Sequence, residues 1–145
     1  MKEIVPGNPK KNAYLWRQIE AQTEDLIQKA EKLAAQMKEL LKEGEKDKER
    51  QLRNIQEVAE QSTSWAEVEL FIRYQGARKQ IPAAWVPQAI DALSKLEGIA
   101  KRIASGEPPE VIRRIHLELI RRVLGYTVRW HVAHVKGEPQ QQGGR

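Results

Sequence analysis

Apolar residues recur at intervals of three and four along most of this chain, which is the period of a helix with one buried face. One long stretch runs from Asn12, which can cap a helix start, to Glu43. Shorter stretches cover residues 51–61, 65–80 and 87–105, and the last runs from Pro109 to Lys136. We find no strand-like alternation. The pattern predicts an all-α fold, a five-helix bundle with a long N-terminal helix and a long basic C-terminal helix.

Residues that start or stop helices separate these stretches. Ser64 and Glu67 have the spacing of a capping box ahead of the third helix. Pro82 ends that helix, because proline disfavours helical backbone in the residue before it. The residues of the third helix that we expect in the core are Val68, Phe71, Ile72 and Tyr74.

Polar segments flank the helical region of this 145-residue chain. Residues 1–11 contain two prolines, a glycine and three lysines, which predicts a flexible basic arm. Residues 137–145 are mostly glycine and glutamine, which cannot build a core, so a disordered tail is expected. Residues 12–136 would then form a single helical domain.

The predicted C-terminal helix differs sharply between its two faces. At 100° per residue, one face is apolar from Ile112 to Trp130. The opposite face is diluted only by Glu118, and it carries Arg114, Arg121, Arg122, Arg129, His131 and Lys136. Residues 109–136 contribute +4 to a net charge of +5. Such a face attracts an anionic partner, and arginine suits phosphate because its planar fork donates two hydrogen bonds.

Two features of this helix have a second interpretation. The basic face can instead be solvated or paired with acidic residues 43–49. The apolar coverage extends to Leu117, Ile120, Leu124 and Val135, which fits either a central helix of the bundle or a contact with a neighbouring subunit. Because the basic face lacks aromatic residues, it favours contact with a nucleic-acid backbone over base stacking.

The composition argues against catalysis. The chain has no cysteine, which excludes disulfides, thiolate zinc sites and cysteine nucleophiles. His131 and His134 have the spacing of a helical metal pair, but further ligands are missing, so we expect no metal, no cofactor and no enzyme activity. The N-terminus lacks an apolar signal core, and no apolar run is long enough to cross a bilayer, so a cytoplasmic protein without membrane contact is expected.

Three short segments, taken together in their order and spacing, resemble a known family. They are Gln51–Asn54 (Gln-Leu-Arg-Asn), Arg73–Arg78 (Arg-Tyr-Gln-Gly-Ala-Arg) and Val123–Tyr126 (Val-Leu-Gly-Tyr), the last followed by Arg129, Trp130 and His131. This arrangement resembles the small subunit of type III CRISPR effector complexes, the Csm-type small subunit in particular. The chain departs from the family pattern at Glu49–Arg50, Gln75 and Gly125, and its N-terminal helix has no clear counterpart. It is therefore also similar to the equivalent subunit of a related subtype.

The resemblance implies a non-enzymatic RNA-binding subunit that acts in antiviral defence. Several copies would stack on one another along the ribonucleoprotein filament, beside its backbone and large subunits. They would contact the sugar-phosphate backbones of the guide RNA and target RNA. Cleavage would belong to other subunits. The candidate RNA-binding residues are Arg53, Arg73, Arg78 and Lys79 in or next to the first two segments, Arg129 in the third, and Arg114, Arg121 and Arg122 from the basic face.

A competing interpretation is a helical adapter without an RNA role. The apolar stripe of residues 12–43 continues for about four heptads, which permits a coiled coil with a second chain. Retention on RNA at moderate salt would distinguish the two.

Overall fold

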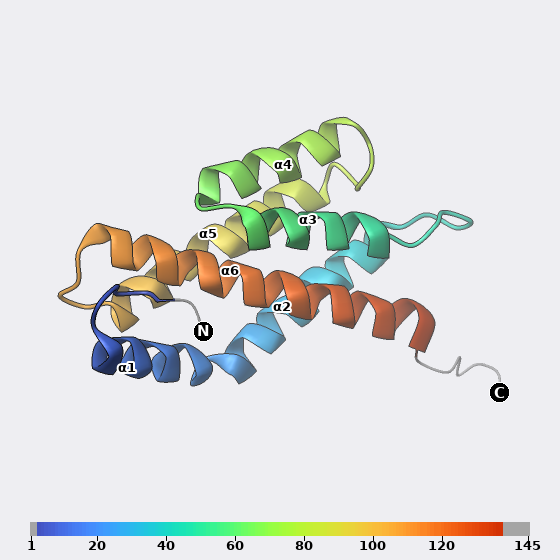
Figure 1. Ribbon diagram of the computed structural model, residues 1–145. Coiled ribbons are helices and arrows are strands. Elements are labelled where there is room, and N and C mark those ends of the chain that lie inside the picture. Colours follow the sequence, from blue (N-terminus) through green and yellow to red (C-terminus); the bar gives the residue numbers. More distant parts are fainter. Residues whose placement is uncertain (1–2, 138–145) are drawn as a thin grey trace.

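The computed structural model describes residues 3–137, which form α-helices and no strand (Figure 1). The elements are α1 (Pro9–Glu20), α2 (Thr23–Leu40), α3 (Glu49–Gln61), α4 (Trp65–Ala77), α5 (Trp85–Ile103), α6 (Pro109–Val132) and a π-helical turn, η1 (Ala133–Gly137). The all-α prediction is confirmed. The prediction of five helices is wrong, because the described residues form six α-helices.

The expected long N-terminal helix is broken into α1 and α2. The chain turns at Ala21 and Gln22, where the Thr23 hydroxyl donates a 2.6 Å hydrogen bond to the Glu20 carbonyl. Such local side-chain bonds compete with the helical ladder. The break lets α1 and α2 follow the core in different directions, whereas a straight helix of this length would project beyond it (Figure 1).

The N-terminal segment is packed where a flexible basic arm was expected. Ile4 is buried, and the Asn12 side chain accepts hydrogen bonds from the backbone N–H groups of Ile4 and Val5 at 2.7 and 2.8 Å. Asn12 therefore holds this segment rather than capping a helix. The cap of α1 is Asn8, whose side chain accepts from the Lys11 N–H, and Pro9 begins the helix.

Helices α3 and α4 form a hairpin around a tight connection. The Ser64 hydroxyl accepts from the Ala66 N–H and so caps α4, as its position in the sequence predicts. Helix α4 ends at Ala77, before the expected residue 80. Helix α5 begins at Trp85, whose fully buried indole donates to the Leu33 carbonyl of α2.

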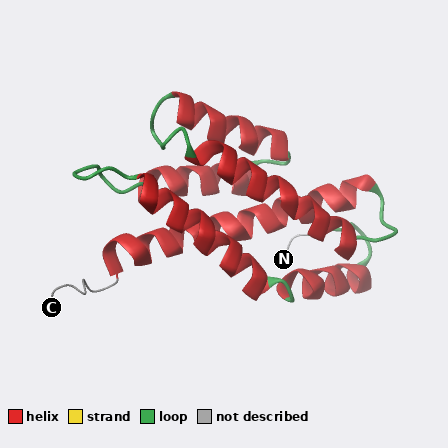
Figure 2. Ribbon diagram, turned by 180° about the vertical axis from the view of Figure 1, so that it is seen from behind, coloured by secondary structure: helices red, strands yellow, loops and turns green. Residues whose placement is uncertain are grey.

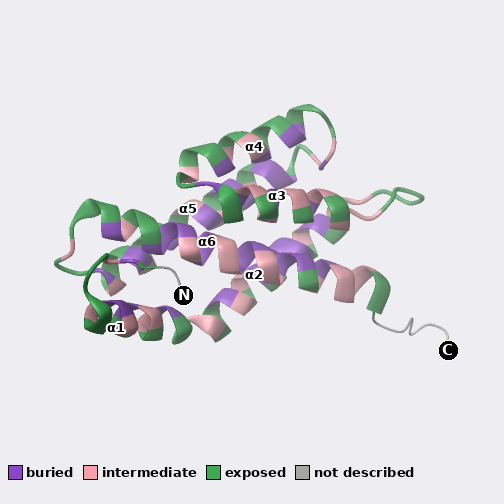
Figure 3. Ribbon diagram, viewed as in Figure 1, coloured by how far each residue is buried: buried purple, intermediate pink, exposed green. Residues whose placement is uncertain are grey.

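Helix α6 is the central element of the fold. It packs against α2, α3 and α5, and it is buried along most of its length (Figure 3). Leu117, Ile120 and Leu124 are all buried within the chain. The bundle itself therefore accounts for the apolar coverage at these three residues, whereas Val135 in η1 is half-buried.

Two further expectations concern the C-terminal tail and membrane-spanning helices. The tail was expected over residues 137–145; Gly137 closes η1, and residues 138–145 lie outside the described part of the chain. Between residues 3 and 137, no helix combines the length and apolar character that crossing a bilayer requires.

Candidate nucleic-acid interface

Arg121 of the predicted basic face is a structural residue. Its Nε donates to the Ala59 carbonyl at 2.7 Å, and one terminal nitrogen donates to the Ser62 carbonyl at 2.9 Å. These carbonyls lie at the C-terminal end of α3, where helical carbonyls lack partners within the helix. Cationic side chains stabilise such ends. Only 12% of the Arg121 side chain is exposed.

Arg122 is likewise engaged within the fold. Its guanidinium pairs with Glu118 one turn earlier on α6 and with Glu20 of α1 at 2.9 Å, and it lies over the Trp16 ring. The two carboxylates come from different elements, and only Glu118 was visible from the pattern of α6. We therefore leave Arg121 and Arg122 out of the candidate interface.

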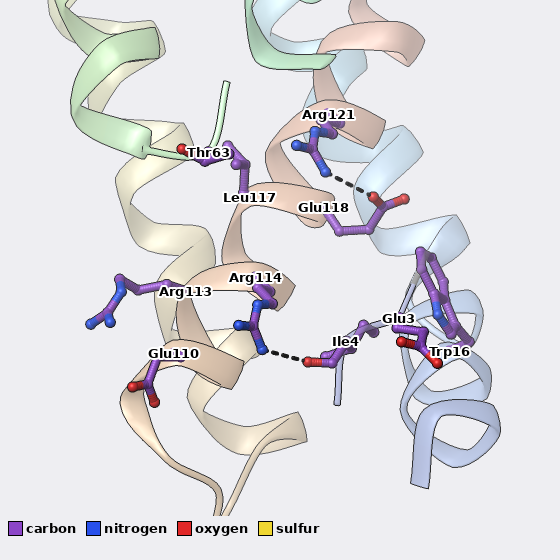
Figure 4. A pocket seen from close by; sticks show the side chains of 10 residues that line it. All are labelled: Glu3, Ile4, Trp16, Thr63, Glu110, Arg113, Arg114, Leu117, Glu118 and Arg121. Atoms are coloured by element: carbon purple, nitrogen blue, oxygen red, sulfur yellow. Dashed lines mark hydrogen bonds and ion pairs between the residues drawn. The ribbon is translucent and has the colours of Figure 1, made fainter. Parts of the chain in front are cut away.

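Arg114 lies in a hollow between α6 and the N-terminal segment (Figure 4). One terminal nitrogen donates to the Ile4 carbonyl at 2.8 Å, so this arginine ties the segment to α6. The neighbouring Arg113, which was not among the predicted residues, is exposed, and Figure 4 shows its side chain pointing away from Arg114. The hollow has a volume of about 450 Å³ and includes Glu3, Glu110 and Glu118, so its charge is mixed.

The sequence predicts His131 on the exposed polar face of the helix, and this prediction is wrong. The ring is fully buried, and its Nε2 accepts a 3.0 Å hydrogen bond from the backbone N–H of Lys48, just before α3. Burial lowers the pKa of His131, although Asp47 and Glu49 oppose the shift. Lys136 pairs with Glu49 at 2.8 Å. These contacts join the end of α6 to the start of α3. For Lys136, they confirm the predicted pairing with acidic residues 43–49.

Arg114 is exposed, but we also leave it out of the candidate interface because it is bonded to the Ile4 carbonyl. The other five candidates are exposed cations at one end of the bundle. Figures 1 and 2 show the start of α3, the end of α4 and the end of α6 at the same end of the molecule, and the hydrogen bonds of His131 and Lys136 join α6 to α3. Gln51–Asn54 lies at the start of α3, Arg73–Arg78 at the end of α4, and Arg129 near the end of α6. We call the following set the basic end: Arg53, Arg73, Arg78, Lys79 and Arg129.

The basic end is only partly neutralised. Arg53 pairs with Glu49 and Arg73 with Glu69, each at 2.8 Å, and both arginine side chains are 56% exposed. Such exposed pairs within one helix stabilise by only about 0.3–0.5 kcal/mol, so a phosphate can replace the carboxylate at little cost. Within residues 3–137, no carboxylate pairs with the other three cations of the set.

A groove between α3 and α6 adjoins the basic end. Gln56 and Glu60 line it from α3, and Tyr126 and Arg129 line it from α6. The Arg129 guanidinium lies 5.6 Å from the centre of the Tyr126 ring. A side chain at Gly125 would approach the Gln56 amide to 3.2 Å, so glycine lets the two helices approach closely beside the groove.

An aromatic residue at the basic end was assigned wrongly from the sequence. Tyr74 was expected in the core, but 52% of it is exposed, and Leu70 one turn earlier is 67% exposed. Helix α4 lies at the outside of the bundle and is apolar on both sides, so periodicity could not tell which side would be covered. The spacing of Tyr74 and Arg78, four residues apart, was the available signal for a surface pair.

In the described part of the chain, no group of three or more His, Cys, Asp or Glu side chains is arranged to hold a metal ion. Comparisons with protein-family models, curated proteins and solved structures find no match to this chain.

Proposed function

We propose that this protein is a non-catalytic, RNA-binding small subunit of a type III CRISPR RNA-guided effector complex. In this proposal, copies stack along the filament and contact the backbones of the guide and target RNA. The observation that carries the proposal is the basic end. Its cations come from the consecutive helices α3 and α4 and from the distant helix α6, and the same three helices carry the segments of the family resemblance.

The chemistry of the basic end supports contact with phosphate. Four of its five cations are arginines, which can donate two hydrogen bonds to one phosphate. Arg53 and Arg73 can exchange weak surface pairs for phosphate, while Arg78, Lys79 and Arg129 need not break an ion pair with any described carboxylate. Backbone contacts of this kind carry no sequence information. That property suits a subunit that must accept any guide.

The adapter interpretation loses the feature that supported it. The stripe expected to form a coiled coil is divided between α1 and α2, and its members Leu26, Ala30, Leu33 and Met37 are fully covered within the chain. A second chain would have no apolar seam to bind along α2.

The test is a double charge reversal, Arg53→Glu with Arg129→Glu, measured with single-stranded RNA and, where it can be assembled, in the whole complex. For single strands, the logarithm of affinity falls with the logarithm of salt concentration by about 0.7 per phosphate contacted. We expect weaker binding to unrelated RNA sequences alike and a flatter salt slope, because two phosphate contacts are lost.

The matched control reverses Lys29 and Lys95, which lie on α2 and α5 and pair with Asp25 and Asp91. It changes the net charge equally but leaves the basic end intact, so affinity should fall much less. Equal loss in both variants would reduce the effect to net charge and would refute the assigned interface. If no guide RNA or large backbone protein is recovered with the chain from its native host, the effector-complex proposal fails.

A further inference from the structure

We propose that Tyr74 and Leu70 of α4 form a stacking platform for an unpaired nucleobase, with Arg73, Arg78 and Lys79 beside it to hold the flanking phosphates. This inference rests on the proposed function, and it adds that the RNA held at α4 is single-stranded. It also departs from the expectation that the protein contacts RNA through the backbone alone.

The first support is the exposure of apolar side chains where the fold does not need them. Val68 and Ile72 on the other side of α4 are fully buried and attach the helix to the bundle. Leu70 and Tyr74, one turn apart, remain uncovered, and among the described residues the only other large hydrophobic with comparable exposure is Tyr14 of α1. The outer face of α4 is open to solvent along its length (Figure 3).

The second support is the arrangement of groups around the Tyr74 ring. The Arg78 guanidinium lies 5.2 Å from the ring centre, and the Phe71 ring lies at 6.4 Å with a tilt of 41°. These contacts place a cation over the Tyr74 ring and a second aromatic ring beside it. Aromatic rings flanked by arginine bind single-stranded nucleic acids, because every base has a face that can stack and the cation adds a favourable interaction.

The third support is the backbone of Lys79. It has φ of +63°, and it is the only non-glycine residue with positive φ in the described chain. The Lys79 N–H bonds to the Gly76 carbonyl and the Gln80 N–H to the Gln75 carbonyl, which is the Schellman pattern of helix ends. Glycine occupies this position at lowest cost, so a lysine here is strained. Strain of this kind gathers at functional sites, where the side chain is needed.

A nucleobase fits this surface better than a protein partner does. A stable protein interface buries about 800 Å² on each side, and its core is depleted of charge. Here two apolar side chains are surrounded by three cations and by Glu69, which already pairs with Arg73. A small planar group joined to phosphates matches both the size and the charge of the surface.

The test measures the binding of fluorescently labelled oligouridine to the full chain at low salt, by anisotropy. The second probe is the same oligonucleotide with abasic sites, which keeps the phosphates and removes the bases. The wild-type chain should bind the abasic probe about five-fold or more weakly. Tyr74→Ala should weaken binding of the normal probe by a similar factor and should no longer distinguish the two probes, whereas Tyr74→Trp should restore the difference.

Tyr14→Ala is the matched control, because Tyr14 is 49% exposed on a different helix. It should bind both probes as the wild type does. Thermal unfolding of each variant checks that Tyr74→Ala remains folded at the assay temperature; if it does not, Tyr74→Ser and Tyr74→Gln are measured in its place.

The outcomes separate this inference from the function on which it rests. If Tyr74→Ala matches the wild type with both probes while the reversal of Arg53 and Arg129 abolishes binding, the stacking platform is refuted and backbone binding stands. If the wild-type chain, alone and in any complex, binds neither probe, both proposals fall. If Tyr74→Ala changes only the oligomeric state, the surface is a protein contact and the inference is overturned.

Discussion

At the scale of single residues, arginines on the same helix have different tasks. The guanidinium of Arg121 is fixed by two carbonyls at the end of α3, whereas Arg129 lies exposed over Tyr126. Hydrogen bonds that involve a charged group contribute about 1.5–3 kcal/mol. We therefore expect Arg121→Ala to lower the free energy of unfolding by about 2 kcal/mol, measured by urea denaturation.

Arg129→Ala is the comparison for Arg121→Ala, since it removes the same side chain from the same helix. Its effect on stability should stay within about 0.5 kcal/mol, as for most surface substitutions. Equal losses for the two variants would mean that the α3 carbonyls do not depend on Arg121.

We expect two buried histidines to make stability depend on pH. Burial lowers the pKa of both His116 and His131 in the folded chain, while unfolding returns them to an ordinary value near 6.5. As pH falls through this value, the unfolded chain binds protons that the folded chain does not, so it is favoured. Stability should be full above about pH 7 and should decline from there toward the lowered folded pKa values.

Urea denaturation at intervals between pH 7.5 and 5.5 measures this decline. The variant His116→Gln with His131→Gln should lose most of it, because glutamine can donate to the Leu93 carbonyl, as the His116 Nε2 does, and accept from the Lys48 N–H. An unchanged pH dependence in the double variant would assign the decline to other groups.

At the scale of elements, glycine reports how closely helices approach. A Cβ at Gly76 of α4 would lie 2.5 Å from Cγ2 of Val86 on α5, whereas Gly98 of α5 has open space around it. Alanine in a helix is favoured over glycine by about 1 kcal/mol. Gly98→Ala should therefore stabilise by that amount, while Gly76→Ala should destabilise by about 1–3 kcal/mol because the branched Val86 must move.

The double variant Gly76→Ala with Val86→Ala checks the cause. Removing the Val86 methyl groups relieves the clash. The double variant should therefore lose less stability than the sum of the losses of Gly76→Ala and Val86→Ala measured separately. Simple additivity, or a stabilising Gly76→Ala, would show that α4 and α5 can separate freely.

At the scale of the whole molecule, we expect α6 to make the bundle unfold as one cooperative unit. It contacts α2, α3 and α5, and the four tryptophans report on different helices. These are Trp16 of α1, Trp65 of α4, Trp85 of α5 and Trp130 of α6. Urea unfolding followed by tryptophan fluorescence and by circular dichroism at 222 nm should give coincident transitions. An earlier fluorescence transition would indicate that an outer helix unfolds separately.

The fold class and most helix boundaries followed from the sequence, because apolar periodicity and caps act over a few residues. Ser64 caps α4 and Pro109 begins α6, as expected. The division of the first helix did not follow, because Ile19 and Leu26 are seven residues apart and so fall on one helical face, although the polar Gln22 and Thr23 lie between them. The breakpoint depends on where α1 and α2 must pack, which involves residues distant in sequence.

The candidate site was predicted in part for the same reason. The cations of the last helix could be identified from its sequence alone. Some of their partners lie on other helices, because Glu20 of α1 pairs with Arg122 and a carbonyl at the end of α3 accepts from Arg121. The sequence by itself determined an all-helical chain with an arginine-rich final helix, because periodicity and charge are properties of neighbouring residues. Only the tertiary structure decided which cations remain exposed and that Tyr74 faces solvent, because both depend on which other helix covers each side chain.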